Sequence, residues 1–158
     1  MVKKVDECKE DLANFKFIVE HSNEEFYQLN IDGNFIYANP AARKNLGYDC
    51  EELKKINIKD IDVSLDDVKY KILIENLKTD SLTNFRTVHK CKNGLCVSKE
   101  LSVFYYIYKG KEYVCGFARD ISKRVAAENA LKDSEEKLRT IFENSPTGIL
   151  MADENGYI

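Results

Sequence analysis

The 158-residue sequence has no apolar run that approaches the roughly 20 residues needed to cross a bilayer. Its first residues, MVKKVDECKEDL, lack the apolar stretch of a secretory signal peptide. The net charge of −3 arises from mixed acidic and basic residues, without the basic stripe that is typical of nucleic-acid-binding surfaces. We therefore expect no membrane segment in this stretch of chain and no nucleic-acid partner.

The sequence also lacks the motifs of common catalytic and metal sites. Its seven glycines mark turns or close strand packing and form no phosphate-binding loop, and its serines have no histidine in a recognisable motif. The cysteines, at positions 8, 50, 91, 96 and 115, are odd in number and have no secretory context. That usage favours a reducing, cytoplasmic compartment over a disulfide framework. We expect neither catalysis nor a metal site in this chain, although its parent protein could be an enzyme anchored in a membrane.

An internal repeat is the most informative feature that is present. Ile18, Glu20, Ser22 and Gly33 recur, with a constant offset and no gap, as Ile141, Glu143, Ser145 and Gly156. A repeat of this length indicates duplicated domains, because each unit is long enough to bury a core of its own. We therefore expect one complete module and the start of a second, both belonging to a longer protein.

Two stretches carry an apolar residue at every third or fourth position, which is the spacing of a helical seam. The first holds Val5, Cys8, Leu12, Phe15 and Val19, and the second holds Ala127, Leu131, Ser134, Leu138 and Ile141. The repeat offset aligns the two stretches, so the same kind of helix enters each module. Each seam could pack on its own domain or against a second copy in a dimer.

Turn dipeptides and helix caps define the elements between these seams. Asp32-Gly33 separates two short β-prone runs, at 26–31 and 35–37. Short helices are predicted after the caps Asn39, Asp49 and Ser64, the last of them reaching about residue 78. Three longer β-prone stretches follow at 82–91, 95–108 and 112–121, and the turns between them predict consecutive antiparallel hairpins.

Taken in order, these elements resemble a PAS domain over residues 15–124, with the start of a second at 141–158. The resemblance is carried by residues 18–22 (IVEHS), 32–33 (DG), 37–42 (YANPAA), 46–48 (LGY), 51–53 (EEL) and 120–122 (DIS). It implies an α+β PAS fold: a five-stranded antiparallel sheet with short helices over one face, flanked by heptad helices. The corresponding division is a helix over 1–21, the PAS domain over 22–122, a connecting helix over 123–143 and a truncated second domain over 144–158.

PAS domains sense small molecules, cofactors or redox state. The resemblance therefore implies a sensory module of a multidomain signalling protein. By the same resemblance, Asp120, Ile121 and Ser122 pass the signal into the helix that begins near Lys123. A sensor histidine kinase is the expected parent, with a diguanylate cyclase or a transcription regulator as alternatives. A dimerisation module with a filled core and no signal input is the rival interpretation.

The family's two common cofactors do not fit the sequence. Flavin photosensors carry a cysteine within an Asn-Cys-Arg-Phe-Leu-Gln stretch, whereas Cys50 lies at a helix start and Ala118 replaces the flavin-contacting glutamine. Haem-binding members use a histidine on the long helix, and residues 65–79 contain none. His21 suits a surface or capping role, and His89 on a strand suits a hydrogen-bonding or surface role. The cofactor stays unknown, and a small organic ligand is possible.

The family pattern places a ligand cavity against one face of the sheet. The residues expected to face it are Tyr27, Leu29, His89, Leu101, Val103, Val114, Gly116 and Ala118. The small Gly116 and Ala118 would leave room, while Tyr27 and His89 would orient a polar ligand. The alternative is that these residues simply fill a core. On the opposite face, Tyr113, Cys115 and Phe117 would be covered by the helix over 5–19 or by that of a dimer partner.

Cys91 and Cys96 form a redox pair only in one hairpin register. A two-residue Asn93-Gly94 turn sets Cys91 opposite Cys96, within disulfide reach. A longer turn sets Cys91 opposite Val97 and sends the two thiols to opposite faces. Both registers are open at this point.

Overall fold

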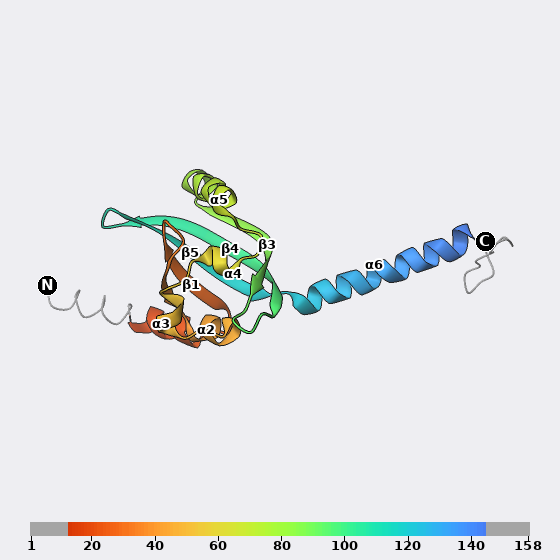
Figure 1. Ribbon diagram of the computed structural model, residues 1–158, viewed down its shortest axis with the longest axis horizontal. Coiled ribbons are helices and arrows are strands. Elements are labelled where there is room, and N and C mark those ends of the chain that lie inside the picture. The colour runs from red at the N-terminus through yellow and green to blue at the C-terminus, as the bar shows by residue number, and fades with distance from the viewer. Residues whose placement is uncertain (1–12, 145–158) are drawn as a thin grey trace. The chain divides into compact units, whose positions relative to one another are not determined.

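The computed structural model describes residues 13–144, which form a five-stranded antiparallel sheet accompanied by helices (Figure 1). The strands are β1 (Glu25–Asn30), β2 (Phe35–Ala38), β3 (Leu82–Lys90), β4 (Cys96–Tyr108) and β5 (Lys111–Asp120). Their order in the sheet is β2-β1-β5-β4-β3, so β5, the last strand in the chain, lies in the middle, and β1 lies between β2 and β5. The predicted α+β architecture is confirmed.

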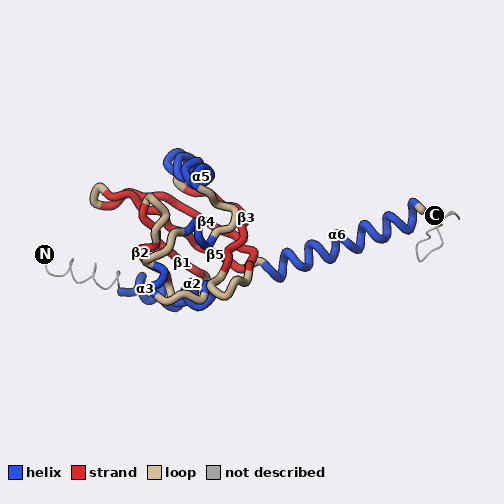
Figure 2. Tube along the Cα trace, viewed as in Figure 1, coloured by secondary structure: helices blue, strands red, loops and turns tan. Residues whose placement is uncertain are grey.

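The helices are short, except for the last two. They are α2 (Pro40–Leu46), α3 (Cys50–Leu53), α4 (Ile58–Ile61), α5 (Asp67–Asp80) and α6 (Ser122–Glu143), and residues 13–21 are also helical (Figure 2). Asn39 and Asp49 cap α2 and α3 as predicted. The predicted cap of α5 is wrong, because Asp66 fills that position. Within residues 13–144, no helix is both long enough and apolar enough to cross a bilayer.

The inner face of the sheet is the face that packs against helices α2–α5. Alternate residues of β1, β4 and β5 point to this face, as the two-residue period of a strand requires. Their buried side chains join those of the helices, such as Leu46, Ile61 and Leu77, in one core. The outer face carries the intervening residues, several of them aromatic.

The chain divides into two compact units, the first ending at Ser122 and the second beginning at Lys123. The described part of the second unit is the rest of α6 and residue 144. No side chain of α6 is buried, and its apolar residues Leu131, Leu138 and Ile141 are all more than half exposed. The predicted seam is therefore present as an uncovered stripe on the helix.

Candidate ligand site beneath the sheet

All eight predicted cavity residues are buried on the inner face. Six of them line a cavity between the sheet and the helices, here called the inner cavity. It is lined by Tyr27, Leu29, Ile58, Asp62, Leu65, Tyr70, Leu73, Phe85, Leu101, Val103, Val114 and Gly116. Its volume is about 30 Å³, which is room for a few water molecules at most.

The small size of the inner cavity has a local cause at Gly116. This residue lies opposite Tyr27 in the β1–β5 register, and a Cβ atom built on it would lie 2.8 Å from Cε2 of Tyr27. The room expected above Gly116 is therefore occupied by the Tyr27 ring. Ala118, which pairs with the first residue of β1, contributes nothing to the cavity wall.

His89 lies beside this cavity, fully buried on β3, and both of its ring nitrogens lack a hydrogen-bond partner among the described residues. Neither the surface role nor the hydrogen-bonding role predicted for it is found. Burial lowers the pKa of His89 to about 4, against the opposing effect of the Asp62 carboxylate. The imidazole is therefore neutral at neutral pH.

Asp62, between α4 and α5, is a functional candidate that the sequence reasoning missed. Its Oδ1 accepts hydrogen bonds from Oγ1 of Thr87 (2.6 Å) and from Oγ of Ser64 (2.7 Å). Its Oδ2 faces Nε2 of His89 at 3.8 Å. The available signal was the Asp62-x-Ser64 spacing of an Asx turn, in which the backbone N–H of Ser64 donates to Asp62 at 2.9 Å.

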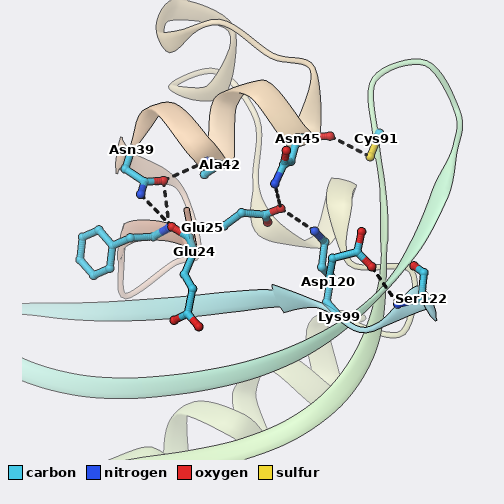
Figure 3. Close-up of polar contacts among 10 residues, drawn as sticks. Glu24, Glu25, Asn39, Ala42, Asn45, Cys91, Lys99, Asp120 and Ser122 are labelled. Carbon is cyan, nitrogen blue, oxygen red and sulfur yellow. Dashed lines mark hydrogen bonds and ion pairs between the residues drawn. The ribbon is translucent and has the colours of Figure 1, made fainter. Parts of the chain in front are cut away.

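A buried ion pair occupies the end of the inner face where β5 terminates (Figure 3). Nζ of Lys99 on β4 lies 2.5 Å from Oε1 of Glu25 on β1, and both side chains are 2% exposed. Nδ2 of Asn45 on α2 donates to the same oxygen at 2.8 Å. Oε2 of Glu25 has no partner among the described residues. The pair therefore ties two strands and a helix together.

The three predicted relay residues follow directly from this end of the sheet. Asp120, the last residue of β5, lies opposite Lys99 in the β4–β5 register. The Asp120 side chain accepts a hydrogen bond from the backbone N–H of Ser122, the first residue of α6, at 2.8 Å (Figure 3). Ile121 is buried, and its N–H donates to the carbonyl oxygen of Ser98 at 3.0 Å. These contacts join the end of β5 to the start of α6.

The prediction of a two-residue turn, which would pair Cys91 with Cys96, is wrong. Gly94 adopts a left-handed conformation (φ 84°) in a three-residue loop, so that Cys96 pairs with Lys90 and the N–H of Cys91 donates to Leu95. Cys91 is buried, and its thiol donates a hydrogen bond to the carbonyl oxygen of Asn45 at 3.3 Å, whereas Cys96 is exposed. The alternative register, with Cys91 opposite Val97, is not found either, although the thiols differ in exposure as it implied.

A second hollow, here called the outer groove, lies on the outer face of the sheet. It has a volume of about 750 Å³ and is lined by Phe15, Lys16, Val19, Phe26, Gln28, Tyr37, Phe104, Tyr106, Cys115 and Phe117. The helix over 13–21 thus forms one wall, but the side chain of Phe15 is still 60% exposed. The rest of the predicted seam, at Val5, Cys8 and Leu12, lies outside the described residues.

The histidine and acidic side chains of residues 13–144 do not gather into a metal site. His21 is exposed, and its Nδ1 lies 2.8 Å from the carbonyl oxygen of Phe17, as a residue near a helix end often does. Over residues 13–144 there is no group of three or more His, Cys, Asp or Glu side chains arranged to hold a metal ion.

Comparison with known proteins identifies the family. A PAS domain family model matches residues 23–123, and a second PAS domain model matches residues 136–158. The chain belongs to the PAS domain family. The first match covers the sheet, helices α2–α5 and the relay residues, so the inner cavity lies in the PAS domain itself.

The chain is similar in sequence to part of a sensor protein and in fold to several solved PAS structures. A methyl sulfide methyltransferase-associated sensor from Methanosarcina acetivorans is 26% identical over 141 residues, which are 89% of this chain but 14% of that protein. The PAS domain of an HTR-like protein from Haloarcula marismortui superposes with a TM-score of 0.67 at 20% identity, over 77% of this chain and 100% of that one. A domain of a sensor histidine kinase/response regulator from Geobacter sulfurreducens superposes with a TM-score of 0.62 at 18% identity, over 70% of this chain and 94% of that one.

Proposed function

We propose that this chain is the sensory part of a multidomain signalling protein, that this parent protein is a sensor histidine kinase, and that the chain acts in the reducing cytoplasm. The observation that carries the proposal is the set of buried polar groups around the inner cavity, since a module that only filled its core would gain stability from apolar residues there. Support for the parent comes from the sensor relative, of which this chain matches 14%, and from the kinase-derived domain of the same fold.

The proposed route for the signal runs along β5. Val114 and Gly116 of β5 line the inner cavity, and the same strand ends at Asp120 beside Lys99. A ligand that moved Tyr27 against Gly116 would displace β5, because the two residues are already in close contact. The displacement would reach Ser122 through its hydrogen bond with Asp120 and so change the start of α6.

We also propose a homodimer, formed through surfaces that the described chain leaves uncovered. The outer groove is lined by half-buried aromatic side chains of the sheet, and α6 exposes its leucine and isoleucine stripe. Apolar surfaces of this kind are typical of protein interfaces, and the spacing of the stripe suits a coiled coil. A second copy supplies the same two surfaces in return, as two-fold symmetry requires.

Native mass spectrometry of the protein as purified tests the sensory proposal. We expect a population heavier than the polypeptide by the mass of a bound small molecule, which denaturation removes. An absorbance scan of the same sample reports on flavin and haem. A bare polypeptide mass, a flat visible spectrum and no response to added small molecules would favour the rival, a dimerisation module with a filled core.

A further inference from the structure

The walls of the inner cavity are apolar except at three side chains, those of Tyr27, Asp62 and Tyr70. The hydroxyl groups of both tyrosines are buried without a hydrogen-bond partner among the described residues. Leaving such a group buried and unpaired lowers the stability of the folded chain. The cavity therefore contains polar atoms whose hydrogen-bonding capacity is unused in this structure, beside a carboxylate oxygen that faces His89 at 3.8 Å.

The charges around these atoms restrict what could bind to them. Asp62 supplies a carboxylate to the cavity wall, and none of the lysines and arginines in residues 13–144 lines it. Lys99 is buried on the same face of the sheet and is paired with Glu25, with Nζ and Oε1 2.5 Å apart. His89 adds no positive charge, because its ring is neutral at neutral pH. An anion would meet the Asp62 carboxylate without a counter-charge, whereas a donor group would be complementary to it.

We propose that the inner cavity binds a small molecule that donates hydrogen bonds and carries no negative charge, with a short alkylammonium ion as the best fit. The donor group contacts Oδ2 of Asp62 and the hydroxyl oxygen of Tyr27, and the alkyl part lies against Leu101 and Val103. This assignment rests on the proposed sensory function and adds the chemical class of its ligand. Asp62 is the residue that selects the class.

The size of the cavity limits the ligand as strongly as its charge does. A volume of about 30 Å³ admits a molecule of very few heavy atoms unless the walls move. Tyr70 on α5 lines this cavity and also an open groove of about 410 Å³ between α5 and the β1–β2 turn. Rotation of Tyr70 would hydrate its unpaired hydroxyl group and join the two spaces, which gives the ligand a way in.

The test compares three small probes of similar size and different charge. Thermal unfolding of the whole chain is followed with ethylammonium chloride, ethanol or sodium acetate at matched ionic strength. Ethylammonium is expected to raise Tm by roughly 5 °C at ten times its Kd, with a smaller rise for ethanol. Acetate is expected to leave Tm at the value measured in sodium chloride. Stabilisation by acetate and not by ethylammonium would overturn the proposal.

Two variants locate the binding site, and a third serves as the control. Asp62→Asn keeps an oxygen that can accept the bonds from Thr87 and Ser64, but replaces Oδ2 by an amide that donates. We expect this variant to fold and its Kd for ethylammonium to rise at least tenfold. Val103→Ile adds a methyl group that fills the cavity, so it should abolish the response without a loss of Tm. The control Asp80→Asn removes an exposed carboxylate of α5 that lines neither space, and this variant should respond like the wild type.

The outcomes separate this assignment from the sensory function itself. A ligand that co-purifies and proves to be an anion would contradict the assignment and leave the sensory function standing. An ethylammonium response that survives in both Asp62→Asn and Val103→Ile would place binding elsewhere and would also contradict it. Failure of every probe together with a bare mass of the purified protein would remove the sensory function as well.

Discussion

The two faces of the PAS sheet are built from the same strands. The inner face is more polar than an ordinary protein interior, and the outer face is more apolar than an ordinary protein surface. The inner face is closed, yet it buries Glu25, Lys99 and His89. The outer face is open, yet it presents Phe26, Phe104 and other aromatic side chains to a groove of about 750 Å³. Charge lies where apolar residues would give more stability, and apolar surface lies where polar residues would be expected.

This contrast separates the work of the two faces. Buried polar groups respond to a bound molecule, because each gains or loses a partner in a medium of low dielectric constant. An apolar open face gains from being covered and is therefore suited to association. The alternation of side chains along β1, β4 and β5 allows one sheet to carry both properties without conflict.

The largest expected effect comes from breaking the buried ion pair on the inner face. Lys99→Met leaves the Glu25 carboxylate buried with only Asn45 as its partner, so we expect the free energy of unfolding in urea to fall by roughly 3–5 kcal/mol. The double variant Glu25→Gln/Lys99→Met removes both charges and should recover most of the loss. Equal destabilisation in the single and double variants would show that packing, not charge, holds this end of the sheet.

A pH titration tests the neutral state of His89. The pKa of this ring is lowered from 6.5 to about 4 in the folded protein, so between these values the unfolded chain binds a proton that the folded chain does not. The free energy of unfolding should therefore fall by about 3 kcal/mol as pH is lowered through this window. His89→Met should lose this part of the pH dependence, and the exposed His21→Gln should retain it. A His89→Met profile that superposes on the wild type would contradict the burial argument.

A charged substitution on the outer face should weaken dimerisation strongly and lower the stability of the monomer much less. Phe117 contacts Phe26 and Phe104 with ring-centroid distances of 4.9 and 6.3 Å. Phe117→Glu should raise the dimer dissociation constant in sedimentation at least tenfold, while monomer stability falls by about 1 kcal/mol. The control Ile107→Glu changes an exposed residue of β4 that does not line the outer groove. Unchanged association and stability in Phe117→Glu would show that this face is not the interface.

The smallest effect concerns the thiols at the β3–β4 turn. The exposed Cys96 should react with a thiol reagent much faster than Cys91, since burial raises the pKa of the Cys91 thiol. Mild oxidation should leave stability unchanged and give no Cys91–Cys96 link in a peptide map. Formation of that link at one equivalent of oxidant would restore the redox-pair hypothesis.

The β-prone runs and the turns between them predicted the strands well. The resemblance to a PAS domain predicted the inward-facing positions Tyr27, Leu101 and Val103, and these positions agree with the alternation of side chains along a strand. Glu25 and Lys99 were missed although they continue the same alternation, since a charged residue is assigned to the surface unless its partner is known. The small cavity volume could not be predicted, because it depends on the Tyr27 ring lying over Gly116 across two strands.

Two local features were ambiguous for a different reason. Asn93-Gly94 suits a two-residue turn and also the three-residue loop that the chain adopts, and only the surrounding strands decide between them. Helix α4 has four residues, which is too short for a periodic pattern, although Asn57 and Asp60 form a capping box at its start. Asp62 follows this helix directly, so missing α4 also concealed the carboxylate of the site.

The most direct test of ligand sensing through β5 is an amide NMR titration of the labelled protein with ethylammonium chloride. We expect the amide signals of Tyr27, Val103 and Gly116 to shift together with those of Asp120, Ile121 and Ser122, with one common Kd. Val103→Ile should abolish both groups of shifts. Shifts confined to the cavity residues, with Asp120, Ile121 and Ser122 unchanged at saturation, would contradict the proposed link between the inner cavity and α6.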